Sequence, residues 1–252
     1  MRQDVSIPTA EGDMRAFVFT PAQGDGPWPA AIIFMDAPAI RPALFDMGQR
    51  LADAGYYVLL PDLFWRAGPY PPLDIAKARA GDPEMGALFQ KLRGSTDIEK
   101  QMADTKACLD FLAKQPQAKA DRVGVTGYCM GGSIALRAAG TFPDRIVAAA
   151  SFHGGNMATD ASSSPHLLAP KVKAKVLVAG ADEDGSFDEA QKERLDAALT
   201  EAGVDAQVSI WKGCRHGWVP ADMPVHNAEG AERHWQELIR LFDETLKEKV
   251  AA

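Results

Sequence analysis

Residues 123–136, with the sequence VGVTGYCMGGSIAL, constrain the fold more than any other part of the chain. A run rich in β-branched residues precedes a glycine-flanked turn and then small residues suited to a tightly packed helix. The pattern matches the strand–turn–helix elbow G-x-S-x-G, with Cys129 in the place of serine. Gly127 and Gly131 lack a Cβ, so strand and helix can approach closely at this turn. Because a helix N-terminus favours a thiolate, the segment predicts a nucleophilic cysteine on a sharp bend.

Apolar runs of strand length alternate with helical patterns along the rest of the chain. Strands are predicted at residues 14–20, 30–35, 56–60, 122–126, 146–152, 175–179 and 206–211. Helices are predicted at residues 42–55, 96–113, 130–140, 188–202 and 227–249. This alternation predicts an α/β fold with a doubly wound, mostly parallel sheet flanked by helices. Residues at the carboxyl ends of the strands would then face one shared crevice.

The chain shows no internal repeat, so we expect residues 1–252 to form one domain. Residues 64–95 contain several prolines and glycines and give no long periodic pattern, although residues 73–80 could form a short helix. Such insertions are often lids over an active site, and equally often surface excursions. We expect an irregular, lid-like insertion here.

Composition narrows the class of partner. A net charge of −7 without a cluster of Lys and Arg makes nucleic acid and anionic membranes unsuitable partners. Three cysteines without C-x-x-C spacing argue against a disulfide framework and a zinc site, and no metal or cofactor is expected. There is no signal-peptide pattern and no apolar run of membrane-spanning length, so the cytoplasm is the default location.

A nucleophilic cysteine needs a base, and His216 is the first candidate among the histidines. It follows the last predicted strand on a loop, which is where enzymes with this elbow carry their histidine. His153 ends another strand and could contact substrate or serve a structural role. His226 and His234 fall at or within the last helix and are expected to be solvated.

Three carboxylates compete for the role of the acid that orients the histidine: Asp182, Glu183 and Asp184. Related hydrolases place this acid at the start of a D-x-x-[VF] turn just before a helix. That pattern favours Asp184, which is followed by Gly-Ser-Phe, over Asp182. The acid would hold the imidazole and stabilise its protonated form.

An oxyanion hole requires two backbone donors. The N–H of Met130, directly after the nucleophile, is one candidate, and Ala37 after the predicted strand 30–35 is the other, because Pro38 has no N–H. Asp36 could hold the thiol protonated at rest or be an ordinary turn residue. Trp218 could contact an apolar part of the substrate or belong to the core.

With Gly127-x-Cys129-x-Gly131-Gly132, Asp184 and His216-Gly217 in this order, the chain resembles the dienelactone hydrolase family. The resemblance extends over nearly the whole chain, including segments 35–42 and 56–62. It implies a single-domain α/β-hydrolase fold and hydrolysis of a small ester or lactone. Cys129 would attack the carbonyl, His216 would protonate the leaving group, and water would release the acyl-enzyme.

The resemblance also bears on the substrate. In dienelactone hydrolases a glutamate after the third strand contacts the nucleophile, and Asp36 would be its shorter counterpart. Those enzymes hold a substrate carboxylate with arginines, one of them four residues beyond the catalytic histidine, where this chain has Pro220. Arg66, Arg79 or Arg93 could supply a cation instead.

Two other functions stay open at this point. The same three residues could serve a general esterase or a thioesterase. A non-catalytic protein of this fold could bind a ligand or sense oxidants through Cys129, although such a protein would not need Asp184 and His216 together. A metal-dependent hydrolase is disfavoured, because no H-x-x-x-H pattern or cluster of carboxylates is present.

Overall fold

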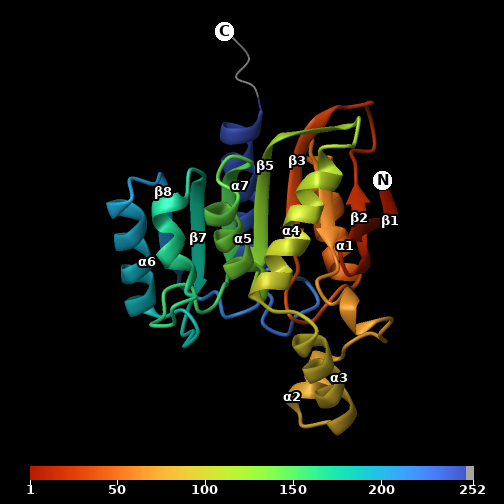
Figure 1. Ribbon diagram of the computed structural model, residues 1–252. Helices are drawn as coiled ribbons and strands as arrows, with labels where there is room; N and C mark the ends of the chain where they lie inside the picture. The colour runs from red at the N-terminus through yellow and green to blue at the C-terminus, as the bar shows by residue number, and fades with distance from the viewer. Residues whose placement is uncertain (248–252) are drawn as a thin grey trace.

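The computed structural model describes residues 1–247, and eight strands in this part of the chain form one mixed sheet. Their order is β1-β2-β4-β3-β5-β6-β7-β8, with β1 and β2 antiparallel to their neighbours and β4 to β8 parallel to one another and to β3 (Figure 1). The predicted mostly parallel sheet is confirmed. The strands are β1 (Arg2–Thr9), β2 (Gly12–Phe19), β3 (Trp28–Phe34), β4 (Tyr57–Pro61), β5 (Ala118–Tyr128), β6 (Ile146–Phe152), β7 (Lys175–Ala181) and β8 (Ala206–Trp211).

Helices cover both faces of the sheet, as a doubly wound fold requires. In Figure 1, α4, α5 and α6 lie in front of the sheet, and α1 and α7 lie behind it. The α-helices are α1 (Pro42–Asp53), α2 (Ile75–Arg79), α3 (Pro83–Gly94), α4 (Ile98–Leu112), α5 (Met130–Thr141), α6 (Glu189–Glu201) and α7 (Ala228–Leu246). Short 3-10 turns, η1 (Trp65–Ala67) and η2 (Pro165–Lys171), lie in the connections.

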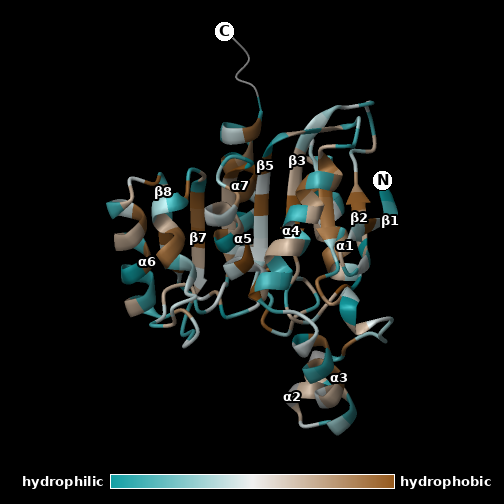
Figure 2. Cartoon of the chain, viewed as in Figure 1, coloured by the Kyte–Doolittle hydropathy of each residue, from teal (hydrophilic) through white to brown (hydrophobic). Residues whose placement is uncertain are grey.

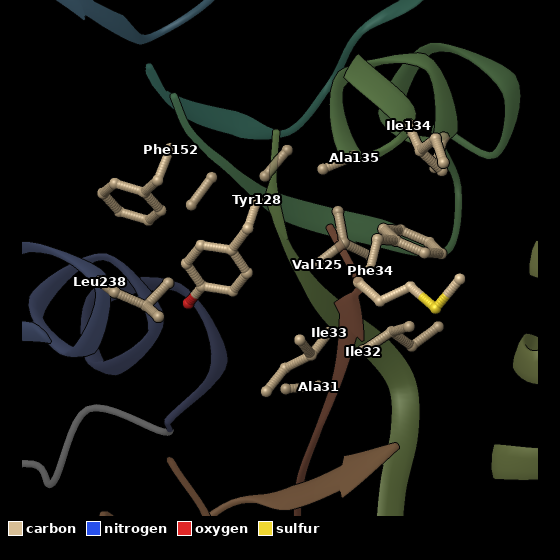
Figure 3. Close-up of a cluster of buried hydrophobic side chains, with 14 of the residues drawn as sticks. Ala31, Ile32, Ile33, Phe34, Val125, Tyr128, Ile134, Ala135, Phe152 and Leu238 are labelled. Atoms are coloured by element: carbon tan, nitrogen blue, oxygen red, sulfur yellow. The ribbon is translucent and has the colours of Figure 1, made fainter. Parts of the chain in front are cut away.

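The central strands are apolar because helices bury both of their faces. Residues 30–34 of β3 are fully buried, and the hydropathy colouring shows brown and white strands beside helices that alternate brown and teal (Figure 2). In Figure 3, Tyr128 at the end of β5 belongs to the same buried cluster as Phe152 of β6 and Leu238 of α7. Burying each large side chain of this kind contributes roughly 1.5–3 kcal/mol. The core therefore fixes the carboxyl end of β5, where Cys129 follows.

Two parts of the fold differ from the sequence prediction. Strand β1 was not predicted, because its sequence is mostly polar and it lies at the edge of the sheet with Ile7 as its buried side chain. The final helix ends at Leu246 rather than at position 249, and positions 248 and 249 lie outside the described residues.

The segment 64–95 is less irregular than predicted. Pro83 interrupts the sequence pattern, but at the first turn of a helix it needs no hydrogen bond, and here α3 begins at Pro83. The Asp82 side chain caps this helix by accepting from the backbone N–H groups of Glu84 and Met85, at 3.1 and 2.9 Å. Helices α2 and α3 project from the sheet (Figure 1). Among residues 1–247, no helix is both long enough and apolar enough to cross a membrane.

Candidate active site

Cys129 is the single residue between β5 and α5, and it has a backbone conformation that few residues adopt. Its φ is 53° and its ψ is −113°, so the chain turns from strand to helix within one residue. Strain of this kind persists only where the surroundings enforce it. The Cys129 N–H is held by the carbonyl of Phe152 at 3.1 Å and by Nδ1 of His153 at 3.0 Å. The side chain is partly exposed.

The neighbouring glycines are required by contacts with backbone atoms. A Cβ at Gly127 would lie 1.9 Å from the carbonyl oxygen of Gly131, and a Cβ at Gly131 would lie 2.1 Å from that of Phe34. Neither position can hold a side chain without moving the main chain. The close approach packs the start of α5 against the carboxyl end of β3.

Three side chains from three loops meet beside this turn. Nε2 of His216 lies 3.1 Å from Sγ of Cys129, and Nδ1 of His216 lies 2.6 Å from Oδ2 of Asp184. The other oxygen of Asp184 accepts from the backbone N–H and the hydroxyl of Ser186, at 2.9 and 2.7 Å. Cys129, His216 and Asp184 thus form one continuous hydrogen-bonded chain.

Electrostatics in this chain favour a proton on the histidine. Burial acts to lower the pKa of His216, but hydrogen bonds to Asp184 and Cys129 outweigh it and raise the pKa to about 10. Burial acts to raise the pKa of Asp184, but hydrogen bonds from His216 and Ser186 outweigh burial and lower this pKa to about 2. An imidazolium between a carboxylate and a sulfur atom is the arrangement that supports a reactive thiolate.

The competing acid lies elsewhere. Asp182 accepts from the backbone N–H of Gly213 at 2.9 Å and from Nζ of Lys212 at 3.0 Å. These bonds tie the loop after β7 to the loop after β8. Of the two aspartates, Asp184 is the one that contacts His216.

The two backbone N–H groups expected to form the oxyanion hole have no acceptor in the described part of the chain. Within residues 1–247, neither Ala37, in the loop after β3, nor Met130, at the start of α5, has a hydrogen-bond acceptor for its N–H. Met130 is the residue after the cysteine, and the contact between Gly131 and Phe34 brings its helix to the end of β3. Ala37 lines the cavity beside Cys129, whereas Met130 is not among the described residues that line it.

His153 is fully buried at the end of β6 and lines the same cavity as Cys129. Burial and the nearby His216 hold its pKa well below the ordinary value. Because Nδ1 accepts from the Cys129 N–H, the proton of the neutral ring is on Nε2, which has no partner within the described chain. Trp218 is also fully buried and packs on the His153 ring with centroids 5.0 Å apart. Trp218 is not among the residues that line the cavity.

His234 differs from its sequence interpretation. It is fully buried in α7 rather than solvated, and its Nε2 lies 2.8 Å from the hydroxyl of Tyr128. Burial lowers the pKa of His234 to about 3. The pair joins α7 to the residue that precedes Cys129. His226 is exposed, as predicted.

Asp36 is buried and pairs with a residue that the sequence interpretation did not single out. Its two oxygens accept from Nη1 and Nη2 of Arg41 at 2.5 and 2.9 Å. Asp222 accepts from Nε and Nη2 of the same guanidinium at 2.6 and 3.1 Å. Burial raises the pKa of Asp36, although Arg41 opposes the rise. Within the described chain, Asp36 forms no hydrogen bond with Cys129. Arg41 lies in segment 35–42, which contributes to the family resemblance but gives Arg41 no role, and Asp222 lies in no motif that was identified.

A cavity of about 270 Å³ opens beside the sulfur atom. Cys129, His153 and His216 line it on the side of the sheet, and the described residues Ala78, Gly86, Phe89 and Gln90 line it from α2 and α3, together with Asp36, Ala37, Pro38, Gly217 and Met223 from loops. The insertion thus supplies a wall of the cavity.

Of the arginines proposed for a substrate carboxylate, Arg66 and Arg93 are not among the described residues that line this cavity. Arg66 pairs with the buried Asp104 at 2.8 Å, and Arg93 is exposed with Nη1 2.8 Å from Sδ of Met130. The side chain of Arg79 lies outside the description. Within residues 1–247, no group of His, Cys, Asp or Glu side chains is arranged to hold a metal ion.

Known proteins are similar to this chain in architecture and in sequence. A protein of Synechocystis sp. with the provisional name carboxymethylenebutenolidase is 26% identical over 251 residues, covering 96% of each chain. The crystal structure of a provisionally named dienelactone hydrolase from Klebsiella pneumoniae superposes with a TM-score of 0.83 at 25% identity, covering 97% of this chain and 98% of that one. A dienelactone hydrolase-like promiscuous phosphotriesterase from metagenomic libraries has a TM-score of 0.79 at 22% identity, covering 98% and 99%.

These likenesses confirm the α/β-hydrolase fold expected from the resemblance. The family model described as "Dienelactone hydrolase family" matches residues 14–246, which include the elbow, all three candidate acids and His216. The protein is thus a hydrolase, and it belongs to the dienelactone hydrolase family.

Proposed function

We propose that the protein hydrolyses carboxylic esters or lactones through a Cys129–His216–Asp184 triad and an acyl-enzyme. The observation that carries the proposal is the 3.1 Å approach of His216 Nε2 to Cys129 Sγ, with Asp184 at 2.6 Å behind the ring. This chain of contacts ends in a small cavity that can admit a substrate. The names of the relatives fit the same chemistry.

The first half of the reaction forms a thioester. Cys129 gives its proton to Nε2 of His216, and the resulting thiolate attacks the substrate carbonyl carbon. The carbonyl oxygen takes the negative charge and accepts from the N–H groups of Ala37 and Met130. His216 then donates the proton to the leaving oxygen as the carbon–oxygen bond breaks, while Asp184 keeps the ring oriented.

The second half returns the free enzyme. Water loses a proton to Nε2 of His216 and attacks the thioester carbonyl, and the same two N–H groups hold the oxyanion. Collapse of this intermediate breaks the carbon–sulfur bond and releases the acid, and the proton on His216 returns to the sulfur. No cofactor is needed. A small ester or lactone is the partner, the segment 64–95 acts as a lid, and a working thiol suits the cytoplasm.

Hydrolysis of p-nitrophenyl acetate by the wild type and by Cys129→Ala tests the proposal. We expect the variant to lose at least about a thousandfold in rate, since the members of such a triad act as a unit. Cys108→Ala is the matched control, because Cys108 is a buried thiol in α4 outside the cavity. Mass spectrometry after rapid acid quench should detect an acetyl group on the peptide that contains Cys129. Equal activity in the wild type and Cys129→Ala would contradict the assignment.

A further inference from the structure

The cavity beside Cys129 is small and mostly apolar. Its volume of about 270 Å³ is just below the usual range for ligand pockets, roughly 300–1,000 Å³. Phe89, Met223, Ala37 and Pro38 give it apolar walls. No Lys or Arg is among the described residues that line it. Its fixed acidic group is Asp36, whose side chain is almost fully buried.

The arginine bonded to Asp36 has no donor left for a ligand. A guanidinium has five N–H donors. In Arg41 the carboxylates of Asp36 and Asp222 take four of the contacts, and Nη1 also donates to the carbonyl of Ala39 at 3.2 Å. The side chain is 12% exposed. A substrate carboxylate would have to displace one of the two aspartates to reach it.

The charges of this cluster do not cancel. Two carboxylates face one guanidinium, which leaves one net negative charge with Asp36 on the cavity wall. A carboxylate entering this cavity would lose water and meet the like charge of Asp36, and the described lining offers it no Lys or Arg. The positive charge of a protonated His216 is already paired with Asp184.

We propose that the Asp36–Arg41–Asp222 cluster makes the active site selective for uncharged acyl groups and excludes substrates that carry a carboxylate on the acyl part. This inference rests on the proposed esterase function and adds the class of substrate. It departs from the carboxylate-bearing substrate that the family resemblance implies. Asp36 and Asp222 thereby act as specificity-determining residues.

Two esters of matched shape test the selectivity. 4-Nitrophenyl 4-carbamoylbenzoate and 4-nitrophenyl 4-carboxybenzoate differ by an amide in place of an ionised carboxylate, and both release nitrophenolate. With the wild type at neutral pH, we expect kcat/KM for the carboxylate to be lower by a factor of about ten or more, because like charges in a partly buried site repel strongly. The two uncatalysed rates are subtracted.

Asp36→Asn removes the charge on the wall while keeping the side-chain shape, and the ratio of the two kcat/KM values should narrow by roughly tenfold. Asp222→Asn removes the other charge at a more exposed position, so it provides the test if Asp36→Asn does not fold. Asp144→Asn is the charge-matched control, since Asp144 pairs with Lys173 in an exposed ion pair away from the cavity. It should leave the ratio unchanged.

The outcomes separate the two proposals. Equal kcat/KM for both esters in the wild type would overturn the selectivity, as would a ratio that stays the same in both Asp36→Asn and Asp222→Asn. In either case Cys129-dependent hydrolysis of the amide ester would still support the esterase function. No Cys129-dependent turnover of either ester, nor of p-nitrophenyl acetate, would refute the proposed function and this inference with it.

Discussion

Replacing Asp184 by asparagine tests the candidate triad most directly, because this carboxylate accepts three hydrogen bonds with two oxygens. One oxygen serves His216 Nδ1, and the other serves the N–H and hydroxyl of Ser186. Asparagine has a single side-chain oxygen, so it cannot accept at both ends. If that oxygen serves the fixed backbone N–H of Ser186, the amide NH2 faces Nδ1. The ring proton must then move to Nε2, where the imidazole cannot take a proton from Cys129.

The size of the loss follows from the histidine. The rise in the pKa of His216 from 6.5 to about 10 corresponds to about 5 kcal/mol in favour of the imidazolium. Asp184 and Cys129 together outweigh burial. The hydrogen bond to Asp184 is the largest contribution that raises this pKa, so loss of the Asp184 charge costs on the order of 2–3 kcal/mol, or roughly a hundredfold in rate. Loss of the correct tautomer adds to this, and the comparable change in a serine protease costs about 10⁴-fold. We expect kcat/KM to fall by about 10²–10⁴.

The assay is the pH dependence of kcat/KM with an alkyl ester such as methyl acetate, followed by titration of the released acid, because an alkoxide leaves only with a proton whereas nitrophenolate leaves without one. Because the imidazolium protonates the leaving group, the wild-type rate should fall as pH rises through about 10, and in Asp184→Asn the fall should occur at lower pH. Asp182→Asn is the control, since Asp182 bonds Lys212 and Gly213 rather than His216. It should keep the wild-type rate within about threefold. Full activity in Asp184→Asn, with a large loss in Asp182→Asn, would refute the assignment.

Three further results are expected. Phe89→Ala should enlarge the cavity and shift the optimum of kcat/KM toward longer acyl chains, measured over a series of p-nitrophenyl esters; an unchanged optimum would remove α3 from the substrate site. Gly127→Ala should abolish folding or activity, because its Cβ would lie 1.9 Å from the Gly131 carbonyl oxygen. The control is Gly94→Ala, whose Cβ would have no atom within 4 Å. This control should change the free energy of unfolding in urea by at most about 1 kcal/mol. The buried neutral His234 should cost stability as pH falls from 6.5 toward about 3, by about 1.4 kcal/mol per pH unit, because the unfolded chain binds the proton first; denaturation of His234→Gln over this range should lack that part of the slope.

The sequence predicted the parts of the fold that depend on buried periodicity. Strand β3 and its parallel neighbours appear as apolar runs because helices cover both faces of the sheet. Strand β1 has one solvated edge and a polar sequence, so its pairing with β2 leaves no such signal. Helix α3 was missed because proline disrupts the interior of a helix but is well suited to its first turn, where Pro83 lies. Only the Asp82 cap distinguishes the two.

The site residues that could be predicted are those marked by a local sequence motif, whereas those defined by contacts between distant residues could not be predicted. Cys129 is marked by its own neighbours, and His216 and Asp184 by their positions after strands. The ion pair between Arg41 and Asp222 joins residues 181 positions apart, and no sequence spacing predicts it. Trp218 is an aromatic residue of the kind that often contacts a substrate, but its side chain is fully buried and packs against His153. A sequence cannot distinguish an aromatic ring in a cavity from one packed just behind it.

The geometry of the nucleophile and the shape of the cavity are held by different kinds of contact, and this has a consequence for specificity. The elbow depends on main-chain atoms: the carbonyls of Gly131 and Phe34 leave no room for a side chain at Gly127 or Gly131. The cavity wall depends on side chains of α3, such as Phe89, on a helix that projects from the sheet (Figure 1). Substitutions in α3 can therefore change the acyl group that is accepted without moving Cys129, whereas a side chain at either glycine must displace the turn itself. If the proposed mechanism holds, the charge and size of the cavity, rather than the elbow, therefore determine which acyl group this chain accepts.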